Sequence, residues 1–275
     1  MTALARNPVT ADLAFLRYTT AGLLLLPWLM RHSPHRLAGI GWAKGAVLAF
    51  LAGPLFVLAG ASAYLFAPLA HGAVIQLGML TLMSILLAAL LARERPGAQR
   101  IAGLGTIITG LVVTAGRGLL EGGSTAWIGD ILFAVAGSMW ALFTVLQRRW
   151  AIHPLAATAV VSVLSGAVYA PIYLVLNGLQ HIAAVAPAMV IEQIAVQGIL
   201  SGTLALFAFS QTVSDLGAGR AALFPALAPV VAMLLGIPLI GEYPTSIQVL
   251  GLSILFVGLA VALTGASRAT TKPEG

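Results

Sequence analysis

The chain has 275 residues, of which 60% are hydrophobic and 8% are charged, and its net charge is +6. Soluble globular proteins have roughly 25% charged residues, so this composition excludes an ordinary soluble domain and indicates a chain whose solvent is the lipid bilayer. The basic residues lie in short breaks between apolar runs, where they set membrane topology and do not predict nucleic-acid binding. The absence of cysteine excludes disulfides, thiolate nucleophiles and Cys-ligated metals.

Apolar runs follow one another along the chain, each close to the roughly 20 residues that cross a bilayer as a helix. They cover residues 10–30, 42–64, 66–92, 100–116, 126–147, 155–177, 190–213, 218–240 and 246–265. No ten-residue pattern of alternating polarity recurs, so helices are the expected element. The sequence therefore predicts an all-α membrane protein, a polytopic bundle of about nine transmembrane helices.

The distribution of basic residues predicts the orientation of these helices. Positive charges follow the first apolar run instead of preceding it, which argues against a signal peptide and favours an outside N-terminus. With that orientation, 11 of the 14 lysines and arginines face the cytoplasm. Residues 92–100 and 148–154 are then cytoplasmic, whereas residues 117–125 and 241–246 face out. The expected location is the cytoplasmic (inner) membrane of a bacterium.

The break "ARERPGAQR" (92–100) has a counterpart in "IGEYPTSIQ" (240–248), at an offset of 148 residues. At this offset, residues 70–115 match residues 218–263 at 12 of 46 positions, including Gly103 with Gly251 and Gly110 with Gly258. Five predicted helices separate the two breaks, so the copies lie on opposite faces of the membrane. The sequence predicts an inverted repeat with halves 1–120 and 121–275, an arrangement typical of secondary transporters.

Three stretches resemble one family. "GDILFAVAGSMWALFTVLQRR" (129–149) is similar to the helix that opens the second half of EamA-type proteins of the drug/metabolite transporter superfamily. Residues 221–263 resemble their last two helices, and "LAFLRYTTAGLLLLP" (13–27) resembles their second helix. The resemblance implies ten helices in two inverted repeats, cytoplasmic termini and transport of small metabolites. The family's first helix is missing, so we expect either a start at a downstream methionine or a shortened member.

Polar and aromatic residues within the runs are candidates for lining a substrate cavity. A polar side chain facing lipid is unfavourable, so each should face either water or a neighbouring helix, and the alternative to a cavity is an interhelical hydrogen bond. Pro225 and Pro229 indicate a hinge or an irregular stretch that lines a cavity, and the alternative is a tolerated kink. The candidates are Gln76, Thr81, Ser138, Trp140, Ser210, Gln211 and Phe224.

Arg17 is a basic residue well inside a run and is therefore also a substrate-binding candidate. The alternative is that it reaches the outer interface or pairs with Asp12, which the neighbouring Tyr18 favours. Asp12 and Asp130 stand at predicted helix starts, where an acid suits the helix dipole. We interpret both as helix caps, and we expect Glu94 and Glu242 to have the same structural role instead of coupling protons.

No P-loop, nucleophile elbow or metal-ligand spacing occurs in the sequence, so an enzyme, a cofactor and a metal site are not predicted. The predicted function is a secondary transporter that moves small organic metabolites, such as amino acids or related compounds, by alternating access. The alternatives are a non-transporting subunit, a truncated inactive carrier and, less favoured, a lipid-modifying enzyme. The expected partners are a small-molecule substrate and membrane lipid, with no nucleic acid, and the expected state is a monomer or homodimer.

Overall fold

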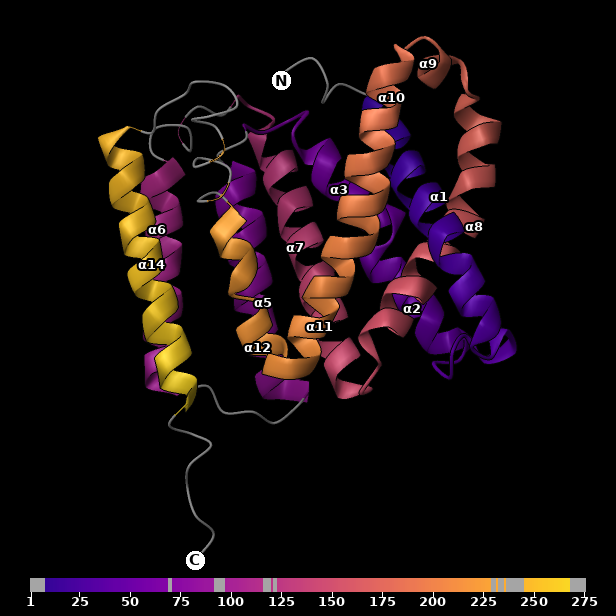
Figure 1. Cartoon of the computed structure of the whole chain (residues 1–275). Coiled ribbons are helices and arrows are strands. Elements are labelled where there is room, and N and C mark those ends of the chain that lie inside the picture. Colours follow the sequence, from indigo (N-terminus) through magenta and orange to yellow (C-terminus); the bar gives the residue numbers. More distant parts are fainter. Residues whose placement is uncertain are drawn as a thin grey trace, which may run out of the picture. The chain divides into compact units, whose positions relative to one another are not determined.

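The computed structural model describes residues 8–68, 71–91, 97–115, 120, 123–228, 231, 235 and 245–267. Long helices dominate these residues (Figure 1). The first half contains α1 (Pro8–Arg31), η1 (Pro34–Arg36), α2 (Trp42–Ala52), α3 (Pro54–Ala63), η2 (Gly72–Gln76), α5 (Leu77–Leu91) and α6 (Ala98–Ala115). The second contains α7 (Ala126–Arg149), α8 (Pro154–Asn177), α9 (Gln180–Ala183), α10 (Pro187–Gln193), η4 (Ile194–Ala205), α11 (Leu206–Leu216), α12 (Ala218–Ala221), η5 (Phe224–Leu227) and α14 (Ser246–Ser267).

The helices fall on the predicted apolar runs. Within the described ranges, five segments are long and apolar enough to cross a membrane: Thr10–Arg31, Trp42–Ala63, Ala126–Arg149, Pro154–Asn177 and Pro187–Leu216. Three shorter apolar helices, Gly72–Ser84, Ile101–Thr114 and Ser246–Ala262, match three further runs. The run at 218–240 is described mainly at its beginning, and Glu94, Pro229 and Glu242 lie outside the described residues. The prediction of a polytopic helical membrane bundle is confirmed.

Two compact units divide the chain differently from the predicted halves. The first unit comprises Met1–Leu65 with Leu142–Gly217, and the second comprises Phe66–Ala141 with Ala218–Gly275. Each unit therefore combines parts of both halves of the sequence. Helix α7 contributes residues 126–141 to the second unit and residues 142–149 to the first.

In the second unit, α6 and α14 lie side by side over most of their length (Figure 1). The contact reaches the backbone: a Cβ added to Gly103 would lie 2.5 Å from the amide nitrogen of Ala262. A Cβ added to Gly251 would likewise lie 2.5 Å from the amide nitrogen of Thr114. The beginning of each helix thus contacts the end of the other, so the two helices are antiparallel. Glycine is needed at both places because no side-chain atom fits between the backbones.

These contacts reproduce the repeat found in the sequence. Gly103 and Gly251 are 148 residues apart, and their partners at positions 114 and 262 are also 148 residues apart. Midway along the pair, Gly110 faces Leu255 and Gly258 faces Ile107, and these four residues obey the same offset. Each contact between the two copies is thus matched by a second contact in which the equivalent residues are interchanged. This is the geometry of an inverted repeat.

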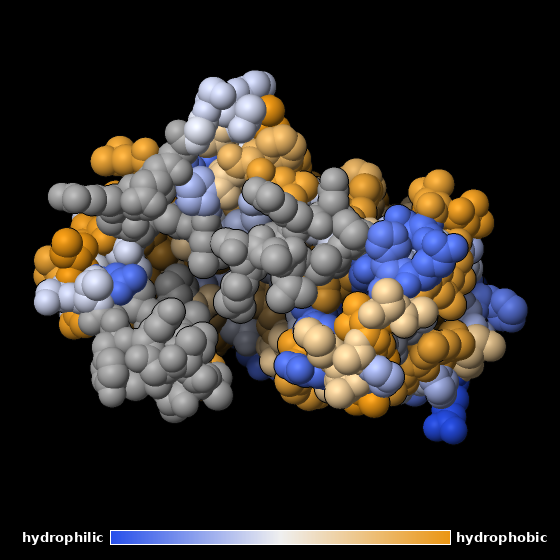
Figure 2. All heavy atoms as spheres, turned by 90° about the horizontal axis from the view of Figure 1, so that it is seen from above, coloured by the Kyte–Doolittle hydropathy of each residue, from blue (hydrophilic) through white to orange (hydrophobic). Residues whose placement is uncertain are grey.

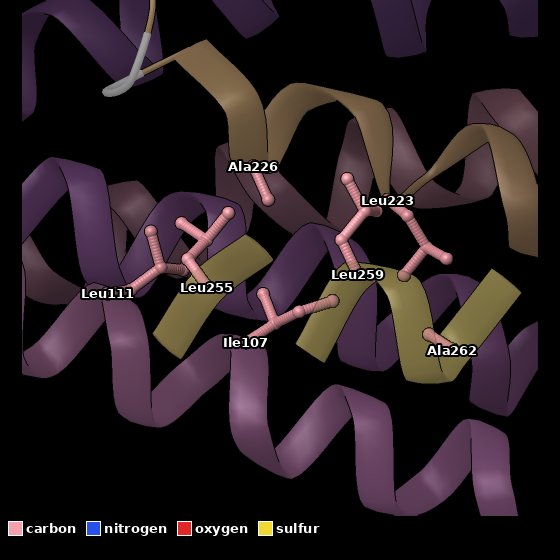
Figure 3. Close-up of a cluster of buried hydrophobic side chains, with 7 residues drawn as sticks. All are labelled: Ile107, Leu111, Leu223, Ala226, Leu255, Leu259 and Ala262. Atoms are coloured by element: carbon pink, nitrogen blue, oxygen red, sulfur yellow. The ribbon is translucent and has the colours of Figure 1, made fainter. Parts of the chain in front are cut away.

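A cluster of apolar side chains joins this helix pair to the beginning of the run at 218–240 (Figure 3). Ile107 and Leu255 are fully buried at its centre, and Leu223 is buried against them from the end of α12. Because lipid is as apolar as these side chains, close packing and not exclusion from water accounts for their association. The cluster consists of Ile107, Leu111, Leu223, Ala226, Leu255, Leu259 and Ala262.

In the first unit, α1 and α8 form a second antiparallel pair. A Cβ on Gly166 would lie 2.6 Å from the carbonyl oxygen of Tyr18, and one on Gly22 would lie 3.0 Å from the carbonyl oxygen of Ser162. Tyr18 and Gly166 are 148 residues apart, so the pair is centred on two equivalent residues. The same offset therefore governs the close helix contacts in both units.

The N-terminal part of α1 and the C-terminal part of α8 are joined by a hydrogen bond in which the Tyr173 hydroxyl donates to Oδ1 of Asp12. A hydrogen bond to a carboxylate contributes about 1.5–3 kcal/mol. Tyr173→Phe should lower the thermal midpoint of the purified protein by the corresponding amount. Tyr169→Phe is the matched control, because the Tyr169 hydroxyl lies 3.4 Å from the carbonyl oxygen of Ala11 and should contribute less. Equal midpoints for the two variants would contradict this assignment.

Large hydrophobic side chains cover the sides of the helices. Figure 2 looks down on one end of the helices and shows hydrophobic residues at the margins of the described surface, with hydrophilic residues among them on the end face. Val175 is 84% exposed and Phe50 is 57% exposed, values that would be unfavourable in water. These faces are suited to contact with lipid chains.

Candidate functional site

The first irregular segment is the break between α2 and α3. Gly53 separates the two helices, and a Cβ there would lie 2.0 Å from the carbonyl oxygen of Ala49. The amide of Phe56 bonds to the Gly53 carbonyl, which deprives the Ala52 carbonyl of its regular helical partner. The buried hydroxyl of Tyr18 donates to that carbonyl at 2.8 Å. The break is therefore stabilised by α1.

The repeat counterpart of this break is also irregular. Residues 46–57 become 194–205 when shifted by 148, and the structure is π-helical over Ile194–Ala205. This segment packs on α1 through Gly198 and Gly202, whose spacing of four residues permits close helix approach. Irregular backbone within a membrane is tolerated where it is buried in protein or lines a cavity. Interrupted helices of this kind often form transporter binding sites.

Arg17 lies against this π-helical segment. Its Cγ is 3.2 Å from the position of a Cβ on Gly202, and its guanidinium carbon is 5.7 Å from the centre of the Tyr18 ring. Its Nε is buried and has no hydrogen-bond partner. Seven residues of the apolar span Thr10–Arg31 precede Arg17, so it lies about 10 Å from the start of that span.

The structure corrects two expectations about Arg17. Asp12 accepts a hydrogen bond from Tyr173, and no ion pair between Asp12 and Arg17 occurs among the described residues. Tyr18 is only 1% exposed, so it is a buried residue and not an interfacial anchor. Both reasons for placing Arg17 at the outer interface are wrong, because neighbouring helices already bind these two side chains.

Ser210 and Gln211 also belong to the first unit. Ser210 is fully buried; its carbonyl accepts a hydrogen bond from Nε2 of Gln147 at 3.1 Å, while its hydroxyl has no partner. Oε1 of Gln147 is also buried without a partner. Gln211 donates through Nε2 to Asp215 on its own helix. Ser210 with Gln147 thus provides unfilled hydrogen-bonding capacity, whereas the amide nitrogen of Gln211 is occupied.

In the second unit, Gln76 ends the π-helical segment η2 and is half-buried. Its carbonyl oxygen lies 2.4 Å from the position of a Cβ on Gly137, so α7 touches the backbone of η2 there. The neighbouring Ser138 donates its hydroxyl to the carbonyl of Ala134, within its own helix. Trp140, two residues further on, is half-buried. The structure therefore brings Gln76 close to the part of α7 that carries Ser138 and Trp140.

Thr81 and Phe224 lie where α5 contacts the beginning of the run at 218–240. Thr81 is 1% exposed and its hydroxyl lies 2.9 Å from the carbonyl of Leu77 and 3.3 Å from that of Ala222. Its hydrogen bonding is structural, as the interhelical alternative predicts. Phe224 begins the 3₁₀ segment that contains Pro225 and is 39% exposed. The irregularity predicted around Pro225 is present.

The predicted site residues are therefore divided between the units. Arg17, Ser210 and Gln211 belong to the first, and Gln76, Thr81, Ser138, Trp140 and Phe224 to the second. Their convergence on one substrate cavity stays a prediction.

A titratable pair that the sequence did not predict lies in the second unit. Nδ1 of His71 is 2.7 Å from Oδ1 of Asp130, with side-chain exposures of 8% and 33%. Nε2 of His71 is buried without a hydrogen-bond partner. The sequence indicated only a helix cap at Asp130. The available signal was topological: both residues lie near the predicted outer ends of their runs, so they stand at a similar depth in the membrane.

Antiparallel helix pairs related by one offset, together with interrupted apolar helices, define a polytopic helical membrane protein built as an inverted repeat. The sequence model of the EamA-like transporter family matches residues 3–116 and 127–264. The chain belongs to the EamA-like transporter family and is an integral membrane protein.

Two curated relatives are similar over part of their length. The uncharacterized transporter YyaM of Bacillus subtilis is 26% identical over 196 residues, which cover 70% of this chain and 63% of the relative. An uncharacterized transporter of Archaeoglobus fulgidus is 30% identical over 142 residues, which cover 50% of this chain and 47% of the relative. The matches thus span less than two thirds of either relative.

The fold of this chain is similar to that of a protein of known crystal structure, with a TM-score of 0.77 and 19% sequence identity. The alignment covers 98% of this chain and 92% of the other. This similarity extends along nearly the whole chain and supports the helical fold.

Proposed function

We propose that the chain is a secondary carrier that moves small organic metabolites across the cytoplasmic membrane of a bacterium by alternating access, as a monomer or homodimer. The observation that supports this most directly is the exchange of equivalent residues across the antiparallel pairs α6–α14 and α1–α8. Two copies in opposite orientations can each adopt the conformation of the other, which converts an outward-open state into an inward-open one.

The proposed substrate carries a carboxylate, as amino acids do. Arg17 lies in the middle part of a transmembrane helix, where an unpaired arginine costs at least about 2.5–3.5 kcal/mol on insertion scales. Its unpartnered Nε and its position against the π-helical segment favour binding of an anionic group. A zwitterionic substrate fits because the described helices present few other charges.

Arg17→Gln should weaken the apparent affinity for such a substrate roughly 10- to 100-fold, since a hydrogen bond to a charged group contributes about 1.5–3 kcal/mol. Protein level in the membrane should stay close to that of the wild type, and Arg17→Lys should retain part of the affinity. Arg31→Gln is the matched control, because Arg31 is an exposed residue at the last turn of the same helix. Normal affinity in Arg17→Gln would remove Arg17 from the site.

Counterflow in proteoliposomes tests the carrier function directly. Vesicles containing the purified chain are loaded with one amino acid at a time and diluted into a trace of the same radiolabelled compound. A carrier accumulates label transiently, whereas empty vesicles do not. A non-transporting subunit or an inactive carrier would give no accumulation with any compound of the panel, although the purified protein is folded.

A further inference from the structure

The strongest unassigned feature is the pair formed by His71 and Asp130. His71 directly precedes η2, and Asp130 is the fifth residue of α7, about 6 Å along that helix. The 2.7 Å contact joins two segments that are 59 residues apart in the chain. Titratable residues within transmembrane regions are costly and usually mark ion or proton pathways.

The hydrogen-bonding pattern of the imidazole identifies the atom that can exchange a proton. When Nδ1–H donates to the Asp130 carboxylate, Nε2 of a neutral His71 carries a lone pair, and in the charged form it carries a second N–H. In either form this atom is buried without a partner, which is unfavourable for a purely structural histidine. A proton that binds at Nε2 gives an imidazolium already paired with a carboxylate.

Among the described helices of the second unit, few charged residues accompany the pair. Neither α5 nor α14 contains a charged residue, and 126–141 of α7 contains only Asp130. The other charged residues on neighbouring helices are Arg100 at the start of α6 and Arg220 on α12. Arg220 stands two residues before Ala222, whose carbonyl accepts a hydrogen bond from Thr81. Thr81 is ten residues beyond His71, about 15 Å further along η2 and α5, so Arg220 is attached to a different part of these helices. Among the described residues, Asp130 is the acidic residue that pairs with His71.

The backbone beside His71 is suited to respond to a change in its charge. The five residues that follow it are π-helical, and π-helical turns occur frequently at functional sites. The last of them, Gln76, is the candidate substrate residue whose carbonyl touches α7 at Gly137. A change at the His71–Asp130 contact would therefore act on the same two segments, η2 and α7, that carry candidate substrate residues.

We propose that His71 and Asp130 form a proton-binding site that supplies the coupling ion of the carrier. The proton comes from water, is held on Nε2 of His71 opposite the Asp130 carboxylate, and returns to water on release. The partly exposed carboxylate of Asp130 places the pair within reach of the aqueous side at the predicted outer ends of both helices. The coupling role rests on the proposed carrier function, whereas proton binding can be measured without a substrate.

Nuclear magnetic resonance of ¹³C,¹⁵N-histidine-labelled protein in lipid nanodiscs tests proton binding. The signal that disappears in His71→Gln identifies His71 among the five histidines. We expect its Nε2 signal to change between the neutral and charged forms when the pH of the sample is varied, and to respond differently in Asp130→Asn. A His71 signal that keeps one form at every pH at which the protein stays folded, or that is indifferent to Asp130→Asn, would overturn the proposal.

Proteoliposomes containing the pH-sensitive dye pyranine test coupling, with the amino-acid panel as the probe. We expect an amino acid that exchanges in counterflow to drive a pH change in the wild type and in the control His181→Gln, whose histidine lies on the exposed α9. His71→Gln and Asp130→Asn should lose the pH change but keep exchange. Exchange without any pH change in the wild type would overturn coupling. Absence of exchange with every amino acid would instead count against the proposed carrier, while the titration would still decide proton binding.

Discussion

Gly258→Leu is expected to separate α6 from α14 and to remove most of the folded protein from the membrane. A Cβ at this position would lie 2.6 Å from the amide nitrogen of Ile107 and 2.9 Å from the carbonyl oxygen of Gly103. Both atoms belong to the backbone, so neither can rotate away as a side chain would. Overpacking costs typically about 1–3 kcal/mol and more where backbones must move apart, and leucine adds three further carbon atoms to the Cβ.

The matched control is Gly105→Leu on α6. Gly105 is exposed, and a Cβ there meets nothing within 4 Å. Because leucine favours helix more than glycine by several tenths of a kcal/mol, this variant should be as stable as the wild type or slightly more stable. Gel filtration and thermal unfolding of detergent-purified protein measure both variants. Equal yields and midpoints for Gly258→Leu and Gly105→Leu would show that the helix contact is not needed for folding.

Single cysteines at positions 97 and 245 are expected to react from opposite sides of the membrane. An impermeant maleimide added to intact cells should label Thr245→Cys fully and Gly97→Cys not at all, until the membrane is permeabilised. The chain has no cysteine of its own, so each variant carries a single thiol. The arginines at 93, 95 and 100 give the cytoplasmic assignment of the first position.

The structure predicts that the two positions lie on opposite sides of the membrane independently of charge. Gly103 faces Ala262 and Thr114 faces Gly251, so position 97 lies at the end of the pair where α14 finishes and position 245 lies at the end where α14 begins. Labelling of both cysteines from the same side would contradict the antiparallel pair. Exclusive labelling of position 97 would preserve the pair and invert the predicted orientation.

The positions of the helices could be predicted because each span needs a long apolar run and the bilayer permits few alternatives. The run at 155–177, for example, corresponds to Pro154–Asn177. The break at Gly53 and the π-helical segments could not be predicted from hydropathy. They depend on contacts with other helices, such as the Tyr18 hydroxyl that satisfies the Ala52 carbonyl.

The candidate site was predictable only in part. An arginine inside an apolar run signals function by its cost alone, so Arg17 was found. Its environment was not, because the groups that bind Asp12 and Tyr18 come from α8 and α2. The pair of His71 and Asp130 depends on a contact across 59 residues, for which a single sequence gives no direct signal. Similarly, the repeat offset did not reveal which helices of the two halves would pack together.

The contact of Gly103 with Ala262 and of Gly251 with Thr114 has the form of an isologous interface, in which the same patch occurs on both partners. Each half of the chain resembles a subunit, and the two would insert into a membrane in opposite orientations. Identical subunits could not be oriented oppositely by their charges, because every copy would carry the same arginines. Joined in one chain, the halves can differ: "ARERPGAQR" carries arginines, which favour the cytoplasmic side, and "IGEYPTSIQ", at the equivalent position, has none.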